Sequence, residues 1–286
     1  MGYLDRIRAC NNGDTRRYLP LHGLGRRFGW VSPVRADLLK SYPQVFRVAD
    51  DRIDLDPALA DYDTASAALD PVLRDLSEQG HLPHWRDERY AVAAEFGEDP
   101  ILSVERTACP FLGIRSWGFH LNGFVRRPDS LHLWIAERSH TKPTYPGQLD
   151  NTVAGGHPEG LSLAQNVAKE CAEEASIPAD MAARAVPVGM LSYCHESDDG
   201  LKPDQMFCYD LEMPEDFVPV PSDGEVESFT LMPAAVVMAI VRDTDRFKFN
   251  CAPVLINFFI RHGLLDPDRE PDYGRICASL QTPPTP

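Results

Sequence analysis

The alternation of apolar and polar positions divides the chain into two regions. Residues 57–68 and 71–79 carry apolar side chains at helical spacing and lie among acidic loops. Residues 118–126 and 131–138 instead alternate as strands do, and a Pro-Asp-Ser turn sequence separates them. We therefore predict an N-terminal α+β domain over residues 1–112 and a second, α/β domain over residues 113–270.

Further elements are predicted along the second region. Four glycines and three prolines between residues 140 and 160 predict a loop. Ser162 and Gln165 have the spacing of a capping box, which predicts a helix over residues 163–175. The remaining predictions are strands over 186–195 and 205–212, joined as a hairpin by loop 196–204, a strand over 224–232, helices over 233–242 and 253–262, and a loose tail over 271–286.

Composition and charge narrow the class of protein. The chain has 286 residues, of which 43% are apolar and 25% charged, as in an ordinary globular protein. Its formal net charge of -15 disfavours nucleic acids and anionic membranes as partners. The longest mostly apolar run, residues 231–241, is shorter than the ~20 residues that cross a bilayer. With no secretory signal and seven cysteines lacking a CxxC pair, we expect a cytoplasmic protein with free thiols.

Three carboxylates gather on the predicted helix 163–175. Glu170, Glu173 and Glu174 stand at i, i+3 and i+4, so they share one face. Like charges at this spacing destabilise a helix by roughly 0.2–0.5 kcal/mol per pair. A divalent cation would reverse this penalty, because Mg²⁺ and Mn²⁺ prefer carboxylate oxygens and bridge to phosphates. The alternative is that the three form a solvated acidic face of the helix.

The residues before this helix favour metal binding over a solvated acidic face. Gly155-Gly156-His157-Pro158-Glu159-Gly160, followed by Lys169-Glu170-Cys171-Ala172-Glu173-Glu174-Ala175-Ser176-Ile177, resembles the Nudix box, Gx5Ex7REUxEExGU with U aliphatic. The resemblance implies a Nudix α/β/α sandwich with a mixed sheet, and it implies that Glu170, Glu173 and Glu174 bind the catalytic metal, Mg²⁺ or Mn²⁺. The chain departs from the box in that Leu161 occupies its first glutamate position, Lys169 its arginine and Ser176 its last glycine. The ion pair between that glutamate and arginine is therefore missing.

The flanking segments 150–156, 206–211 and 223–229 are similar to one Nudix branch that carries an N-terminal domain called DUF4743. This branch is similar to the Nudix domain of thiamine pyrophosphokinase-related proteins. The resemblance implies a small-molecule substrate, namely a thiamine-type diphosphate, including oxidised or damaged forms, that is hydrolysed to the monophosphate. The alternatives are a nucleoside diphosphate-sugar or dinucleotide pyrophosphatase, and a non-catalytic Nudix-like module that senses a nucleotide.

Candidate residues for the remaining roles lie on both sides of the box. Glu225 or Glu227 is expected to be the catalytic base or a further ligand, and Glu225 is preferred because Gly224 lets the loop approach the metal. The alternative for both is an exposed acid on an edge strand. Substrate contacts are predicted for Trp117, His120, Asn122, Gly155, Gly156, Lys202 and Glu227, with His195 as a further phosphate contact.

Overall fold

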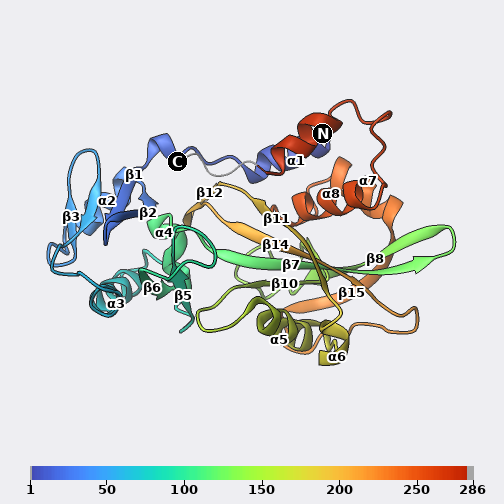
Figure 1. Ribbon diagram of the computed structural model, residues 1–286, viewed down its shortest axis with the longest axis horizontal. Helices are drawn as coiled ribbons and strands as arrows, with labels where there is room; N and C mark the ends of the chain where they lie inside the picture. The colour runs from blue at the N-terminus through green and yellow to red at the C-terminus, as the bar shows by residue number, and fades with distance from the viewer. Residues whose placement is uncertain (1, 282–286) are drawn as a thin grey trace.

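The computed structural model describes residues 2–281, and its N-terminal part forms a small α+β unit at the left of Figure 1. Strands β1 (Leu19–Gly23), β2 (Arg26–Val31), β3 (Phe46–Val48) and β4 (Ile53–Leu55) form a sheet in the order β2-β1-β4-β3. Strands β5 (Arg89–Val92) and β6 (Leu102–Glu105) form a separate antiparallel pair. The helices are α2 (Pro33–Leu39), α3 (Tyr62–Glu78) and α4 (Cys109–Leu112). One hydrophobic core, which extends in sequence from Leu21 to Ile114, holds these elements together.

Helix α3 corrects the prediction of two separate helical segments. It is a single helix with Pro71 inside it, and residues 57–61 lie before its start. Asp61 caps the first turn by accepting a hydrogen bond of 2.8 Å from the backbone N–H of Thr64. The buried face continues past the proline from Leu69 to Leu76. Burial of this face therefore keeps the helix continuous although the proline removes one backbone hydrogen bond.

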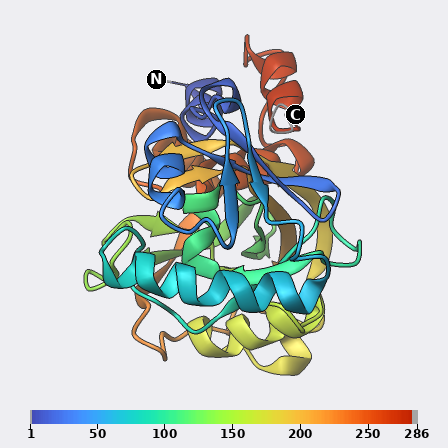
Figure 2. The ribbon, with the colours of Figure 1, turned by 90° about the vertical axis from the view of Figure 1, so that its left-hand side faces the viewer.

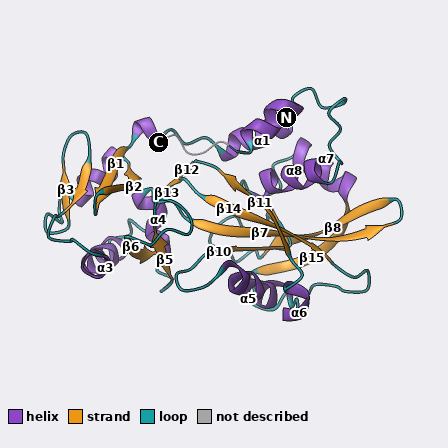
Figure 3. Ribbon diagram, in the orientation of Figure 1, coloured by secondary structure: helices purple, strands orange, loops and turns teal. Residues whose placement is uncertain are grey.

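The C-terminal part is built on a mixed sheet in the order β11-β14-β7-β8-β15 (Figure 3). β14 runs parallel to β7, whereas the other neighbours in this order are antiparallel. Two short strands extend the sheet, because β10 pairs with β7 and β9 with β8. The bounds are β7 (Trp117–Arg127), β8 (Ser130–Arg138), β9 (Leu149–Asp150), β10 (Val153–Gly156), β11 (Val186–Ser192), β14 (Gln205–Glu212) and β15 (Val226–Pro233).

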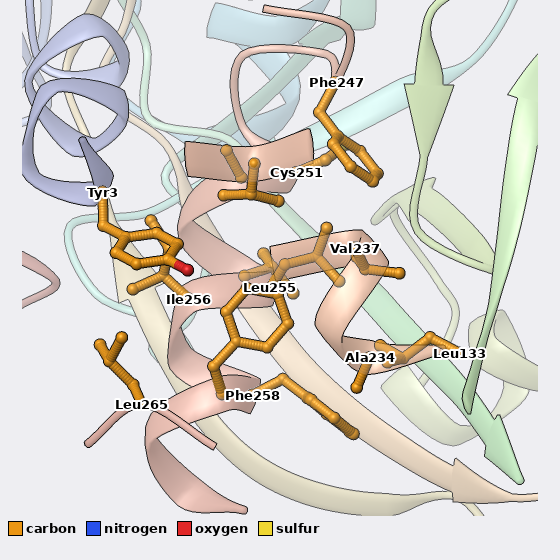
Figure 4. Close-up of a cluster of buried hydrophobic side chains, with 14 of the residues drawn as sticks. Tyr3, Leu133, Ala234, Val237, Phe247, Cys251, Leu255, Ile256, Phe258 and Leu265 are labelled. Carbon is orange, nitrogen blue, oxygen red and sulfur yellow. The ribbon is translucent and has the colours of Figure 1, made fainter. Parts of the chain in front are cut away.

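Helices cover both faces of this sheet. In Figure 1, α5 (Leu163–Ala175) and α6 (Ala179–Ala182) lie below it, and α7 (Ala234–Asp243) and α8 (Cys251–Arg261) lie above it. The alternation of side chains along β7 explains the layers, since Phe119 packs in the cluster of α5 and Phe124 packs 5.6 Å from Phe258 of α8. Figure 4 shows the core on the α8 side, where Leu255 and Leu133 take part. The predicted α/β/α sandwich with a mixed sheet is thus confirmed.

Three segments predicted to be irregular contain regular elements. The predicted loop 140–160 contains β9 and β10, whose hydrogen-bond partners are the distant strands β8 and β7. The predicted tail contains α9 (Tyr273–Ser279), because Ile276 is fully buried in the core on the α8 side. Residues 282–286 of that tail lie outside the described residues. Loop 196–204 likewise takes part in a small hairpin of β12 (His195–Ser197) and β13 (Gly200–Lys202).

The first helix, α1 (Tyr3–Cys10), packs on the C-terminal part rather than on the N-terminal unit. The ring of Tyr3 lies 6.3 Å from that of Phe259, and Figure 2 shows α1 and α9 together at the top of the molecule. The domain boundary near residue 112 stays a prediction. No helix within residues 2–281 has the length and apolar character needed to cross a membrane.

Candidate active site

Helix α5 carries the three predicted glutamates in its C-terminal half. The predicted capping box forms, with Ser162 accepting from the backbone of Gln165 at 3.2 Å and Gln165 accepting from that of Ser162 at 2.8 Å. At the other end Ser176 adopts a left-handed conformation with φ of 51°. Glycine is favoured at this position because it has no Cβ to strain. Ser176 is accommodated there and donates a hydrogen bond of 2.9 Å to the carbonyl of Val220.

Two of these glutamates meet Glu225 at one cavity of about 220 Å³. Glu174 is buried, and its carboxylate accepts a hydrogen bond of 3.1 Å from the backbone N–H of Ala154. Burial raises the pKa of Glu174 well above its usual value, and the nearby carboxylates of Asp150, Glu170 and Glu225 raise it further. Burial also raises the pKa of Glu170. Burial therefore disfavours the ionised form of both glutamates, although Lys169 pairs with Glu170 at 3.0 Å.

Glu225 has a different environment, because the ammonium of Lys142 binds it directly. Burial acts to raise the pKa of Glu225, but Lys142 outweighs burial and lowers it. Glu173 and Glu227 do not line the cavity. The carboxylate of Glu173 is half exposed and pairs with Lys169 at 2.7 Å, and Glu227 is an exposed residue at a register irregularity of β15. Glu225 precedes β15, and Glu227 lies in the register irregularity of that strand. Regular strand alternation therefore does not place the two side chains on one face of the sheet.

Cationic side chains that sequence patterns did not reveal line the same cavity: Arg86, Arg106, Arg138, Lys142 and Lys248. They come from the N-terminal unit, from β8 and the loop after it, and from the segment before α8. No local motif marks them, since only the fold brings these segments together. Arg138 is already engaged, because it donates to Asp150 at 3.0 Å and to the carbonyl of Tyr145 at 3.0 Å. Lys142 and Arg106 also have carboxylate partners, Glu225 and Glu88, so a ligand would share these cations with the pairs already formed.

A buried polar network lies behind the cavity. His120, Asp150 and Cys251 are the group of potential metal ligands within residues 2–281 whose ligand atoms all lie within 4.8 Å of one another. The carboxylate of Asp150, however, already has cationic partners: its Oδ2 lies 3.0 Å from Nη1 of Arg138 and 3.8 Å from Nζ of Lys248. Burial raises the pKa of the Cys251 thiol well above its usual value. The network is therefore complete without a metal, with Asp150 charged and Cys251 a neutral thiol.

The predicted aromatic and amide contacts to substrate lie on opposite faces of β7. Trp117 is on one face, and its ring N–H donates to Gln205 at 3.0 Å. His120 and Asn122 are on the other. Asn122 is buried and does not line the cavities near the glutamates, because its side chain donates to Asp210 at 3.3 Å and accepts from Asn151 at 2.7 Å. Asn122 thus has hydrogen-bond partners within the fold, and its contact with the substrate stays a prediction.

The glycine-rich loop 155–160 is fixed by the N-terminal unit. Tyr62 of α3 donates a hydrogen bond to the side chain of Glu159, whose backbone N–H donates to the carbonyl of Arg89 at 2.8 Å. A Cβ at Gly156 would collide with the hydroxyl of Tyr90, and one at Gly155 would lie 2.7 Å from the Cγ of Glu170. Close approach thus requires glycine at both positions. These contacts hold the loop although Leu161 removes the ion pair that the box normally supplies.

A second, larger cavity of about 900 Å³ continues from the first. The two share Arg86, Arg106, Pro143, Thr144, Gly156 and Met206 as lining residues. The N-terminal unit contributes Trp85 and Tyr90 to the larger cavity, and the C-terminal part contributes Trp117 and Lys202. Lys202 pairs with Asp199 at 3.3 Å. His195 does not line it, because its ring stacks on Phe249 with centroids 3.9 Å apart.

The chain is similar to a family of proteins and to a solved structure. A family model described as a domain of unknown function, DUF4743, matches residues 2–116. A crystal structure of a Deinococcus radiodurans protein aligns with 59% of this chain and 98% of that one, with 20% identity and a TM-score of 0.46.

Two relatives from Arabidopsis thaliana match most of the chain. Nudix hydrolase 20, chloroplastic, is 39% identical over 278 residues, which are 93% of this chain and 74% of that protein. Nudix hydrolase 24, chloroplastic, is 38% identical over 284 residues, or 98% of this chain and 78% of that protein. The expected cytoplasmic location therefore stays a prediction. On the extent and identity of these matches, the chain belongs to the Nudix hydrolase family and is an enzyme of that family.

Proposed function

We propose that this enzyme is a diphosphatase that depends on a divalent cation and hydrolyses a thiamine-type diphosphate, including an oxidised or damaged form, to a monophosphate and phosphate. The observation that carries the proposal is the convergence of Glu170, Glu174 and Glu225 on one cavity that also has cationic walls. That cavity opens into a larger one with aromatic walls. Such an arrangement provides for both ends of a ring-bearing diphosphate.

The carboxylates fit Mg²⁺ or Mn²⁺. Glu170 and Glu174 supply hard oxygen donors, and a cation would offset both the burial and the neighbouring carboxylates that raise the pKa of Glu174. Glu225 would be a further ligand, while Glu173 at the surface would act through Lys169. When bound, the cation withdraws charge from the phosphoryl oxygens and lowers the pKa of the attacking water.

The side chains of this protein would position the diphosphate and move one proton. Arg106, Lys142 and Lys248 would bind its oxygens with charge-assisted hydrogen bonds. Water adds to one phosphorus as the bridging P–O bond breaks, and the electron pair of that bond stays with the departing phosphate. Glu225, which Lys142 keeps ionised, is a candidate acceptor for the proton that the water loses.

The larger cavity would hold the organic part of the substrate. A thiamine-type compound joins two aromatic rings, and Trp85, Tyr90 and Trp117 offer ring faces and edges for contact. Aromatic side chains also attract a cationic ring by about 0.5–2 kcal/mol. The N-terminal unit would therefore contribute directly to substrate binding.

The test is a hydrolysis assay with Mg²⁺ and a panel of thiamine, oxidised-thiamine, nucleotide-sugar and dinucleotide diphosphates. We expect monophosphate from the thiamine group, and a roughly 10²- to 10⁴-fold lower kcat for Glu174→Gln. Glu173→Gln is the matched control, because this half-exposed residue should lose much less activity. Turnover of the nucleotide compounds alone would replace the thiamine assignment by the nucleotide one. Cation binding without turnover of any compound would contradict the proposed hydrolysis and support a sensing module.

A further inference from the structure

The carboxylate of Asp204 lies in the wall of the larger cavity, where Lys202 and Arg115 act on it from a distance but form no direct ion pair with it among the described residues. Asp204 immediately precedes β14 and is only 8% exposed. It accepts a hydrogen bond of 3.2 Å from the backbone N–H of Ser116 and a longer one of 3.4 Å from the hydroxyl of Tyr193. Within residues 2–281, no Lys, Arg or His nitrogen lies within 4.0 Å of this carboxylate, whereas Lys202 pairs with Asp199 instead.

A carboxylate in this position costs folding free energy. Burial raises the pKa of Asp204 to about 6, which means that the ionised form is poorly stabilised by its surroundings. Buried charges in proteins are otherwise paired or fully hydrogen-bonded. A ligand that donates a hydrogen bond from within the cavity would provide the missing partner.

The surroundings of Asp204 select the chemistry of that ligand. The neighbouring wall is aromatic, with Trp117 directly across the paired strands, where Gln205 is in register with it. A carboxylate among aromatic rings suits a heteroaromatic ring that carries an N–H donor or a positive charge. Asp204 would repel a diphosphate, and Arg138, Lys142 and Lys248 line the smaller cavity only, whereas Arg86 and Arg106 line both.

We propose that Asp204 determines specificity by accepting a hydrogen bond from an N–H donor on the heteroaromatic ring of the substrate. The inference rests on the proposed function in that it assigns the ring to the larger cavity and the diphosphate to the smaller one. Asp204 thus orients the substrate so that the bond to be broken lies near Glu170 and Glu174.

Binding measurements separate this inference from the hydrolysis itself. Dissociation constants would be measured by titration calorimetry on the full chain for thiamine monophosphate and adenosine monophosphate, which carry N–H donors on a ring, and for pyrophosphate, which has no ring. Asp204→Asn should weaken binding of at least one ring compound by roughly 10- to 100-fold, the range expected for a hydrogen bond to a charged group. Its affinity for pyrophosphate should change less than twofold, which also shows that the variant is folded. Asp198→Asn, an exposed residue outside the cavity, is the matched control.

The measured affinities either support or overturn the role of Asp204. Equal affinities of wild type and Asp204→Asn for both ring compounds would overturn the role of Asp204, even if thiamine-type diphosphates are hydrolysed. The inference is also overturned if the wild type binds neither ring compound. Ring binding that depends on Asp204, in a protein that hydrolyses no diphosphate, would support the inference and contradict the proposed function. If Asp204→Asn does not fold, Asp204→Ala provides the same comparison.

Discussion

Two neighbouring buried residues behind the active site, Asp150 and His120, differ in charge at physiological pH. Asp150 is buried, yet Lys248 and Arg138 outweigh burial and lower its pKa, so it stays charged. His120 is equally buried, and burial together with Lys248 lowers its pKa from 6.5 to about 4. The imidazole is therefore neutral at physiological pH and hydrogen-bonds Asn151 at 2.9 Å. A neutral His120 and an ionised Asp150 keep the network balanced beneath the cavity.

The depressed pKa of His120 predicts a pH dependence of stability. Between pH 6.5 and about 4 the unfolded chain binds a proton at this residue and the folded chain does not. The free energy of unfolding should therefore fall as pH decreases through this window, with a contribution from His120 of up to about 1.4 kcal/mol per pH unit. Urea unfolding of wild type and His120→Gln at pH 6.5, 5.5 and 4.5 gives the free energy of unfolding of each protein against pH. The difference between the two slopes measures the contribution of His120. Parallel pH dependences for the two proteins would contradict it.

At the scale of elements, the loop of the Nudix box depends on contacts from the N-terminal unit as well as from α5. Asn166 of α5 donates to the carbonyl of Gly156 at 2.7 Å, which fixes one side of the loop. Tyr62 of α3 and the carbonyl of Arg89 of β5 hold Glu159 on the other side. The N-terminal unit thus does more than cover the substrate, because it keeps the backbone beside Glu170 in place.

Tyr62→Phe should loosen this loop without disturbing the fold. The free energy of one such hydrogen bond corresponds to a factor of roughly 2 to 10 in rate. We therefore expect a kcat lower by about this factor. Backbone amides of residues 155–160 should exchange hydrogen faster in the variant. Tyr42→Phe is the matched control, because it removes a hydrogen bond of 2.6 Å to Asp75 within the N-terminal unit. Unchanged exchange in the loop of Tyr62→Phe would show that α3 does not support it.

Elements with local signals were predicted from sequence, and those that depend on distant partners were not. Helix α5 has the predicted bounds, because its capping residues lie next to it in sequence. Strands β9 and β10 were missed because their pairing with β8 and β7 is absent from any local pattern. The same reason applies to the site. Glu170 and Glu174 are marked by a motif, whereas Arg106, Lys142 and Lys248 meet only in the folded chain.

For the whole molecule, the negative net charge and the clustered carboxylates both lead us to expect that a bound cation stabilises the folded state. The net charge of -15 repels itself, and at the proposed cation site the neighbouring carboxylates add to burial in raising the pKa of Glu174. A cation bound only by the folded state stabilises it by RT ln(1 + [L]/Kd), or about 2.7 kcal/mol at a concentration of 100 Kd. Monovalent salt also relieves the general repulsion, but it cannot reproduce coordination by several carboxylates at one point.

Mg²⁺ or Mn²⁺ should therefore raise the thermal stability of the wild type above that measured in EDTA with KCl at matched ionic strength. Glu174→Gln removes a buried charge, so we expect this variant to be more stable than the wild type in EDTA and to gain less from the cation. Glu173→Gln leaves the cavity lining intact and should respond as the wild type does. Thermal unfolding of the three proteins in the two solutions makes the comparison without any substrate. If Glu174→Gln gains as much from Mg²⁺ and Mn²⁺ as the wild type does, the cation acts on the net charge of the molecule, and Glu174 is not one of its ligands.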